Sequence, residues 1–454
     1  MRPPSRAHVA VVGGGAAGLS VAWLLARGGH RVVLLERAAR LGGHADTVRV
    51  PGAGRGGAPL DVDTGFIVYN EPCYPNLARW LDALGVATAP SDMSFAVSRE
   101  AGAFEYAGGP PLGLLAQPSL LLSRRYWAML GGLVRFYREA RAAPPADPAV
   151  TLGDYLARGR YPRAFVEDHL LPFASAVWSS PAATMLDYPA AAFIRFCDNH
   201  GLLSLGRRPR WRTVAGGSRR YVEAVAAALG EGAIETGFEA TRVVRGADGV
   251  AVHAADGRVV EAAHVVLGVH ADEALARLDA PDAAERELLG AFGYADNVAV
   301  LHTDTRFLPR RRRAWCSWNH VERAGHVPGA VSVSYWMNRL QRLDTARDYV
   351  VTLNPDPSPP DAHVVRVARY AHPVFTAAAH AAQRRLWTLQ GRRRTWFCGS
   401  YFGAGFHEDA VQSGFAVAEA LGAPRRPWRL ERPSSRIVLG DAAAASPVPS
   451  SVTA

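Results

Sequence analysis

The sequence contains no lysine, so all 51 of its basic residues are arginine. Cysteine is scarce, and Cys73, Cys197, Cys316 and Cys398 form no C-x-x-C pair, which argues against a disulfide framework or a metal site and predicts unpaired thiols. No apolar run approaches the ~20 residues of a membrane-spanning helix, and the first residues lack the apolar core of a signal peptide. These absences predict a protein that stays in the cytoplasm.

The composition is that of a globular protein with a large core. The chain has 454 residues, of which 49% are hydrophobic, and this length predicts two domains. The formal net charge is +10. We expect most of this charge to lie on a solvated surface, with attraction to anionic lipid head groups as the alternative. The arginines accompany no nucleic-acid-binding motif, so no nucleic acid partner is expected.

A βαβ unit over Val9–Glu36 is the clearest local pattern. An apolar β-branched run leads into Gly13-x-Gly15-x-x-Gly18, a helical pattern follows, and a second apolar run ends on Glu36. The first glycine allows a tight turn, the second lets a pyrophosphate approach the backbone, and the third lets the helix pack closely on the sheet. The helix N-terminus then faces the phosphates, and Glu36 is placed to accept the ribose hydroxyls. The pattern predicts a dinucleotide site.

The residues after Glu36 distinguish between dinucleotides. Arg37 is followed by Arg40-Leu-Gly42-Gly43-His44, and this R-x-G-G continuation resembles the FAD proteins of the glutathione-reductase type, which include amine oxidases and phytoene desaturases. The resemblance implies FAD rather than NAD. The sequence contains no second complete nucleotide fingerprint.

The order of helical and strand patterns predicts an α/β fold whose Rossmann-like FAD-binding domain, of the glutathione-reductase/amine-oxidase type, carries an inserted α+β substrate domain. The flavin is expected at the interface of the two domains. Past Arg425 the chain is rich in Pro, Ser and Ala, which predicts disorder. The expected parts are 1–90, 212–275 and 392–424 for the FAD domain, 91–211 and 276–391 for the substrate domain, and 425–454 for the disordered tail.

The segment Pro110–Ala143 is unusually apolar, with leucines and aromatic residues at helical spacing and Pro118 as a break. A buried helix pair is one interpretation. The other is an apolar lip that rests on a bilayer or admits a lipid tail, which the arginines of the same segment favour.

Several blocks together resemble one branch of the amine-oxidase-like flavoproteins. This branch also resembles the N-terminal flavoprotein region of some cyclopropane fatty acid synthases, and stand-alone members are associated with fatty-acyl methyltransferases. The resemblance implies noncovalent FAD and redox chemistry on an acyl lipid. The blocks are Leu41–Val48, Asp63–Asn70, Ser91–Phe95, Asn199–Leu203, Trp211–Ser218 and Gly405–Asp409.

The resemblance assigns cofactor-binding residues at both ends of the chain. On the ADP half and pyrophosphate it implies Gly13, Gly15, Gly18, Glu36, Arg37, Gly42, Gly43 and His44, with Ala240 contacting adenine through its backbone. On the ribityl and flavin side it implies Gly399, His407, Asp409, Ala410 and Val411. Ser400 departs from the family pattern, which carries an acidic residue at that place.

The missing lysine bears on the chemistry. Many amine oxidases hold a water near flavin N5 with a lysine, and that arrangement is impossible here, which argues against amine oxidation. The candidates for proton transfer are His320, Tyr335, Asn338 and His372, from segments dense in aromatic and amide residues. Each histidine taken alone is more often structural than catalytic.

The sequence therefore predicts an FAD-dependent oxidase or desaturase that transfers a hydride from a fatty-acyl chain to flavin N5. Expected partners are an acyl lipid substrate, the inner face of a membrane and a lipid methyltransferase. Oxidation of a small amine or an isoprenoid is the alternative within the fold. The alternative outside catalysis is an accessory protein of a lipid methyltransferase that binds flavin and converts no substrate itself.

Overall fold

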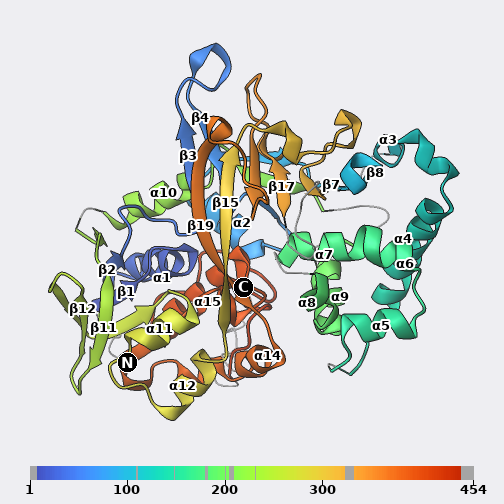
Figure 1. The fold of residues 1–454 in the computed structure, drawn as a ribbon. Helices are drawn as coiled ribbons and strands as arrows, with labels where there is room; N and C mark the ends of the chain where they lie inside the picture. The colour runs from blue at the N-terminus through green and yellow to red at the C-terminus, as the bar shows by residue number, and fades with distance from the viewer. Residues whose placement is uncertain are drawn as a thin grey trace, which may run out of the picture.

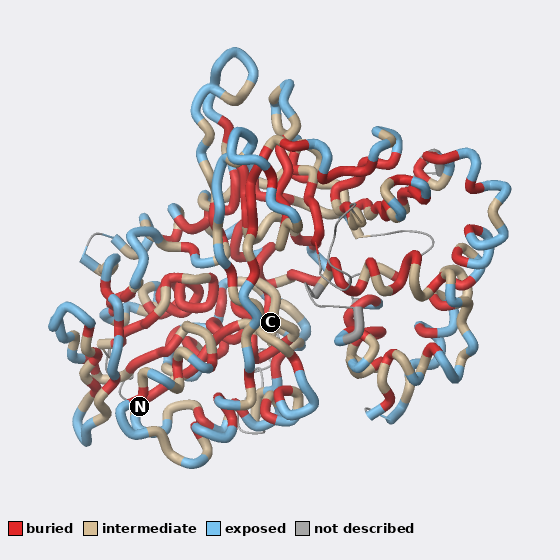
Figure 2. The backbone as a smooth tube through the Cα atoms, in the orientation of Figure 1, coloured by how far each residue is buried: buried red, intermediate tan, exposed pale blue. Residues whose placement is uncertain are grey.

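The computed structural model describes residues 8–108, 111–147, 149–178, 182–199, 201–203, 209–230, 232–322 and 332–440. Figure 1 shows three regions: a parallel sheet with its helices, a large upright sheet above it, and a helical lobe to one side. The interior of each region is buried, and the outer loops are exposed (Figure 2).

The parallel sheet is assembled from distant parts of the chain. Its order is β10-β2-β1-β14-β20, and each neighbouring pair is parallel. The apolar runs Val9–Val12 and Val32–Leu35 are buried, as expected of strands covered on both faces. The strands are β1 (His8–Val12), β2 (Arg31–Glu36), β10 (Ile234–Thr236), β14 (His264–Leu267) and β20 (Thr395–Phe397).

Helices and a small antiparallel sheet cover the parallel sheet. Helices α1 and α15 pack closely, because Gly414 lies where a side chain would overlap the hydroxyl of Ser20. The three-stranded sheet consists of β11 (Ala240–Arg245), β12 (Val250–Ala254) and β13 (Val259–Ala262). The helices are α1 (Ala16–Arg27), α2 (Pro75–Ala83), α10 (Arg219–Leu229), α11 (Ala271–Arg277), α12 (Ala283–Leu289), α14 (Ala377–Gln383) and α15 (His407–Ala420).

The large sheet has seven strands in the order β19-β15-β18-β17-β16-β7-β8. The β16–β7 pair is parallel, and its partners lie more than 200 positions apart in the sequence. The strands are β7 (Phe95–Arg99), β8 (Phe104–Gly108), β15 (Gly293–His302), β16 (Trp318–Val321), β17 (Val333–Trp336), β18 (Val350–Leu353) and β19 (Val364–Val374), with α13 (Met337–Leu340) after β17.

Two small sheets connect the regions. The hairpin β3 (Thr47–Val50) and β4 (Leu60–Asp63) packs its Leu60 and Val62 into the core of the large sheet. The second sheet contains β5 (Val68–Asn70), β6 (Thr88–Ser91) and β9 (Trp211–Val214).

The helical lobe follows β8. It contains one π-helical turn, η4 (Val166–Leu170), between α6 and α7. No helix among the described residues is long and apolar enough to cross a bilayer. The helices are α3 (Pro111–Leu114), α4 (Arg124–Ala142), α5 (Leu152–Arg158), α6 (Arg163–Phe165), α7 (Leu171–Trp178), α8 (Ala182–Leu186) and α9 (Ala190–Asn199), with the short turn η3 (Pro118–Leu122) before α4.

The structure differs from the expected division of the chain in two places. Helices α12 and α14 were expected in the substrate domain, but their Leu288 and Ala379 pack into the core beneath the parallel sheet. The prediction of disorder from residue 425 is wrong as far as residue 440. Arg426 is buried and pairs with Glu419, and Ile437 is buried as well. Residues 441–454 of the predicted tail lie outside the described residues.

Candidate cofactor and active site

Each of the three glycines in the turn after β1 is needed for a different reason. Gly13 has a positive φ of 102°, and a Cβ there would lie 2.6 Å from the Gly268 carbonyl oxygen. A Cβ on Gly18 would overlap the Gly13 carbonyl oxygen. Gly15, in contrast, caps the start of α1, and a Cβ there would meet no atom within 4 Å. The backbone at Gly15 therefore faces open space at a helix N-terminus, which is where a pyrophosphate fits.

The second glycine pair lies directly against this turn. The Gly42 N–H donates to the Gly14 carbonyl at 2.8 Å, and a Cβ on Gly43 would lie 3.2 Å from the Gly15 Cα. The carboxylate of Glu36 accepts hydrogen bonds from the N–H groups of Gly14 and Ala38 at 2.7 and 2.8 Å. These contacts fix the carboxylate at the end of β2, beside the phosphate position.

Two predicted cofactor residues have other partners. Arg37 forms an exposed ion pair with Glu273 at 2.8 Å, pointing to α11 rather than to the glycine turn. The backbone N–H of Ala240 donates to Phe238, and its carbonyl accepts from Arg277 at 2.8 Å, which disfavours the predicted adenine contact. Arg40, the arginine of the R-x-G-G continuation, donates to the Gly43 carbonyl at 3.0 Å.

At the other end of the chain, β20 is followed by a short turn (Ser400–Phe402) and then by α15, which packs against α1. The Gly399 N–H donates to the Ser413 hydroxyl at 3.0 Å, which ties the turn to the helix. The ring of His407 stacks on Phe66 with centroids 3.9 Å apart, and its Nε2 lies 3.0 Å from the Tyr221 hydroxyl. Desolvation lowers the pKa of His407 to about 3, so the ring is neutral at physiological pH.

Asp409 has a structural role at this helix start. Its carboxylate is fully buried, accepts from the Phe406 N–H at 2.8 Å and pairs with Arg436 at 2.7 Å. Burial raises the pKa of Asp409, while the guanidinium of Arg436 opposes that shift. Ala410 and Val411 are buried in the core that α15 shares with α1. Of the four predicted residues here, His407 keeps part of its side chain exposed at the helix start.

A cluster of neutral rings gathers around His44. The His44 ring lies 5.7 Å from His372 on β19, 4.9 Å from Tyr370 and 6.3 Å from His270 at the start of α11. Desolvation is the main cause that lowers the pKa of His44, His270 and His372, and the value for His372 falls to about 4. His44, His270 and His372 are each half-buried, whereas Tyr370 is buried.

His372 has a defined hydrogen-bonding state. Asn354 donates to the Asn297 side-chain oxygen at 2.8 Å, so the Asn297 NH₂ group is the one that faces His372 Nδ1 at 3.2 Å. Nδ1 then accepts, and the neutral ring carries its proton on Nε2. His372 is therefore built to donate a hydrogen bond from Nε2.

The other predicted catalytic residues lie elsewhere on the large sheet. Asn338 holds the chain after β17, because it donates to the Arg347 carbonyl and accepts from the Tyr349 N–H. Tyr335 is buried against Trp318, in the apolar cluster that also contains Tyr370. His320 lies on β16, paired with Val333. The structure thus brings only His372, of the four predicted residues, to the ring cluster around His44.

Comparison with known proteins decides the family. The model of flavin-containing amine oxidoreductases matches residues 16–422. The chain belongs to this family. The match confirms the predicted FAD cofactor, and the open backbone at Gly15 and the fixed carboxylate of Glu36 fit FAD well. Family membership places the chain among the FAD-dependent oxidoreductases.

Individual relatives agree with this family. The flavin-containing monoamine oxidase AofH of Mycobacterium tuberculosis is 29% identical over 283 residues, which is 59% of this chain and 58% of that relative. The chain thus matches less than two thirds of that relative's length. An L-amino-acid oxidase of Bungarus fasciatus is 60% identical over 42 residues, 9% of this chain and 8% of its own.

Solved structures show the same fold. A fatty acid isomerase from P. acnes has a TM-score of 0.60 and 18% identity, and the similarity covers 93% of this chain and 99% of that one. Cyclohexylamine oxidase from Brevibacterium oxydans has a TM-score of 0.62 and 15% identity, covering 92% and 99%. These similarities confirm the predicted α/β FAD-binding fold.

Several residues of the site are not apparent from the sequence. Phe66 and Tyr370 lie inside segments that were singled out, but nothing in the local pattern shows that they face His407 and His44. His270 lies three residues after the end of β14, and its position after a buried strand was a usable signal. Arg436 gave no signal, because it lies in a segment of low hydrophobicity.

Proposed function

We propose that the protein desaturates a fatty-acyl chain: one carbon gives a hydride to FAD, the neighbouring carbon loses a proton to a polar group or water, and a carbon–carbon double bond forms. The observation that carries this proposal is the absence of charge in the ring cluster. His44, His270, His372 and His407 all have lowered pKa values and are neutral at pH 7. An uncharged wall suits an apolar chain and offers nothing to balance an alkylammonium group.

Two buried carboxylates of the adjoining segments, Asp46 and Asp409, are paired with arginine. Asp46 is buried and pairs with Arg40 at 3.0 Å and with Arg366 at 3.5 Å. Asp409 pairs with Arg436. Both negative charges are therefore already matched by arginine, and neither is left over for a cationic substrate.

Within this proposal the flavin, the apolar neighbours of the cluster and His372 have different roles. Bound FAD supplies a hydride acceptor at flavin N5. Tyr370, which lies beside His44, belongs to an apolar cluster that would exclude water from the chain. The Nε2–H of His372 donates a hydrogen bond to a polar group of the substrate, such as an ester carbonyl. A neutral donor does so without adding a charge to the site.

Amine oxidation is the second candidate. The family match and the similarity to AofH favour it. The chain contains no lysine, however, so the lysine-held water of many amine oxidases has no counterpart. One of the structural neighbours is a fatty acid isomerase, so the fold also accommodates a protein that acts on acyl chains.

Anaerobic bleaching of the flavin distinguishes the candidates. The FAD-loaded protein is mixed without oxygen with phospholipid vesicles or with cyclohexylamine, and the visible flavin absorbance is recorded. We expect the phospholipid to bleach the flavin and the amine to leave it oxidised. Bleaching by the amine alone would favour amine oxidation. If neither bleaches a flavin that light and a donor can still reduce, the accessory role without turnover is favoured.

A further inference from the structure

A pocket lies along helix α4, outside the FAD-binding segments. Its volume is about 890 Å³, within the range of small-molecule sites. Its wall is mostly apolar, formed by Leu114, Trp127, Leu130, Leu133 and Val134. Tyr106 and His169 are buried and form its floor.

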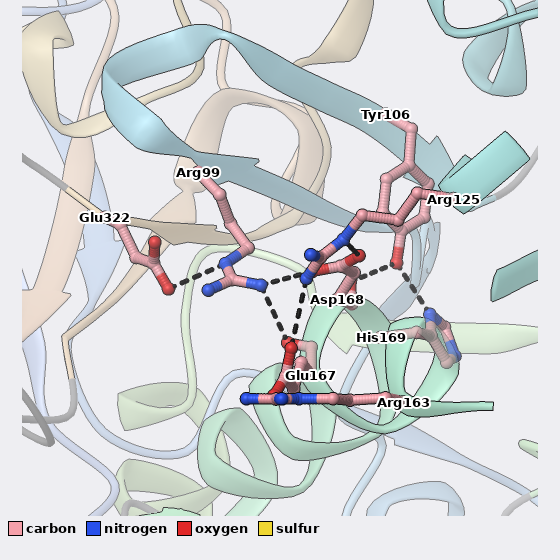
Figure 3. Close-up of polar contacts among 8 residues, drawn as sticks. All are labelled: Arg99, Tyr106, Arg125, Arg163, Glu167, Asp168, His169 and Glu322. Carbon is pink, nitrogen blue, oxygen red and sulfur yellow. Dashed lines mark hydrogen bonds and ion pairs between the residues drawn. The ribbon is translucent and has the colours of Figure 1, made fainter. Parts of the chain in front are cut away.

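Ion pairs hold the floor in place. Figure 3 shows Arg99 and Arg125 converging on the carboxylate of Asp168, which is buried. Arg125 donates to both oxygens, at 2.6 and 2.9 Å. The Tyr106 hydroxyl then bridges the Asp168 carbonyl at 3.1 Å and His169 Nδ1 at 2.7 Å. The π-helical turn η4 is thereby fixed to strands β7 and β8, so the pocket is formed before any ligand arrives.

One position in the pocket wall has no side chain. Gly131 lines it between Leu130 and Leu133, and a Cβ there would meet no atom within 4 Å. Glycine is unfavourable in the interior of a helix, and α4 has one where a side chain would enter the pocket. The neighbouring Gly132 differs, because a Cβ there would lie 2.5 Å from Phe165.

One end of the pocket carries an unmatched positive charge. Arg138 lies one turn after Val134, is exposed, and has no ion-pair partner among the described residues. The other two charged lining residues neutralise each other, because Arg135 and Glu139 pair at 2.8 Å. An apolar wall that ends at a free guanidinium is complementary to a molecule with an apolar chain and an anionic head.

The surface beside the pocket is also apolar. The described part of the chain has eight large hydrophobic side chains that are exposed, and four of them lie between residues 115 and 127. They are Leu115, Leu121, Leu122 and Trp127, and Leu122 is 91% exposed. This concentration at the η3–α4 corner is typical of a surface that contacts an apolar phase.

We infer that the pocket along α4 binds a long acyl chain that carries an anionic head group, with the head group at Arg138. That this chain belongs to the substrate rests on the proposed function, whereas the binding itself does not. The chain can come from a free fatty acid or from an anionic phospholipid, since both have the same chemistry.

Filling the pocket from Gly131 tests this inference. The FAD-loaded full chain is titrated with cis-parinarate, a fluorescent acyl anion, below its aggregation concentration, and oleate is used to displace it. We expect Gly131→Leu to weaken binding at least tenfold, because the leucine occupies the space of the chain. Ala128→Leu places a leucine on the exposed face of α4 outside the pocket and is expected to change the affinity less than twofold.

A second pair of variants tests the head group. Arg138→Gln is expected to weaken binding about threefold, the scale of an exposed charge pair. Arg124→Gln removes an exposed arginine of the same helix outside the pocket, and no change is expected. Thermal unfolding checks that Gly131→Leu folds, and Gly131→Gln serves as a second filling variant.

A parallel titration with vesicles of phosphatidylglycerol that carries a parinaroyl chain distinguishes the two sources. A signal that Gly131→Leu abolishes supports the pocket, whichever source gives it. The inference is overturned if neither source binds saturably. Vesicle binding that Gly131→Leu leaves unchanged would also overturn it, in favour of surface contact alone. Because the readout involves no flavin reduction, binding without turnover would contradict the proposed function and leave the pocket assignment intact.

Discussion

Substitution of single glycines in the turn after β1 distinguishes an effect on stability from an effect on cofactor binding. Gly15 faces open space at φ −78°, which alanine adopts readily, whereas Gly18 is pressed against the Gly13 carbonyl. We expect Gly15→Ala to lower the free energy of unfolding by less than about 1 kcal/mol, yet to weaken FAD binding at least tenfold. Gly18→Ala is expected to lower that free energy by about 3 kcal/mol. Denaturant unfolding and FAD titration measure both, and unchanged FAD affinity in Gly15→Ala would contradict the assignment.

A single histidine also makes a pH-dependent contribution to stability. Burial holds the pKa of His407 at about 3, against an ordinary value of 6.5. Between pH 6.5 and pH 5 the unfolded chain therefore takes up a proton that the folded chain does not, and stability is lost as the pH falls. We compare the free energy of unfolding of FAD-free wild type and FAD-free His407→Gln. As the pH falls from 6.5 to 5, the variant should lose about 1 kcal/mol less than the wild type, allowing for the partial exposure of the ring. Denaturant unfolding at both pH values checks this, and a difference that does not change with pH would refute it.

At the scale of elements, residues 425–440 act as a strap across α15. Arg436 pairs with buried Asp409 and donates to the Cys73 carbonyl at 3.0 Å, which joins the strap to the first turn of α15 and to the segment just before α2. Arg436→Ala leaves the Asp409 carboxylate buried without its partner. We expect a loss of about 3 kcal/mol in the free energy of unfolding. The control, Arg432→Ala on the exposed part of the strap, should lose less than about 0.5 kcal/mol. Equal effects in the two variants would argue against the strap.

The π-helical turn η4 depends on one carboxylate. Asp168 accepts charged hydrogen bonds from Arg99 and Arg125, so Asp168→Asn weakens two of them at once. The expected loss in the free energy of unfolding is about 2 kcal/mol. Asp198→Asn removes a carboxylate from the exposed ion pair with Arg141, and it should have little effect. Thermal and denaturant unfolding of both variants checks the difference.

At the scale of the molecule, only the features that depend on residues close together in the sequence could be predicted. The glycine spacing and the end of β2 at Glu36 lie within one βαβ unit, so the dinucleotide turn could be predicted in detail. The seven-stranded sheet could not, because β7 and β16 pair across more than 200 residues and neither strand carries a mark of its partner. Disorder after residue 425 was predicted from composition, which takes no account of the specific ion pairs of Arg426 and Arg436.

The site was predicted to a similar extent. His44 and His372 were singled out separately, but only the fold shows that they face each other with Tyr370 and His270. Asn338 was predicted as a candidate for proton transfer because its segment is rich in aromatic and amide residues. In the structure its side chain instead hydrogen-bonds to the backbone of Arg347 and Tyr349. Long-range packing thus decides which polar residues meet.

The central claim is that one FAD lies over the turn Gly13–Gly18 and extends to the start of α15. Equilibrium titration of the cofactor-free, folded chain with FAD, and separately with NAD, tests this most directly. The account predicts uptake of one FAD per chain with the visible absorbance of a protein-bound flavin, and no stable uptake of NAD. A folded chain that remains colourless in excess FAD would contradict it.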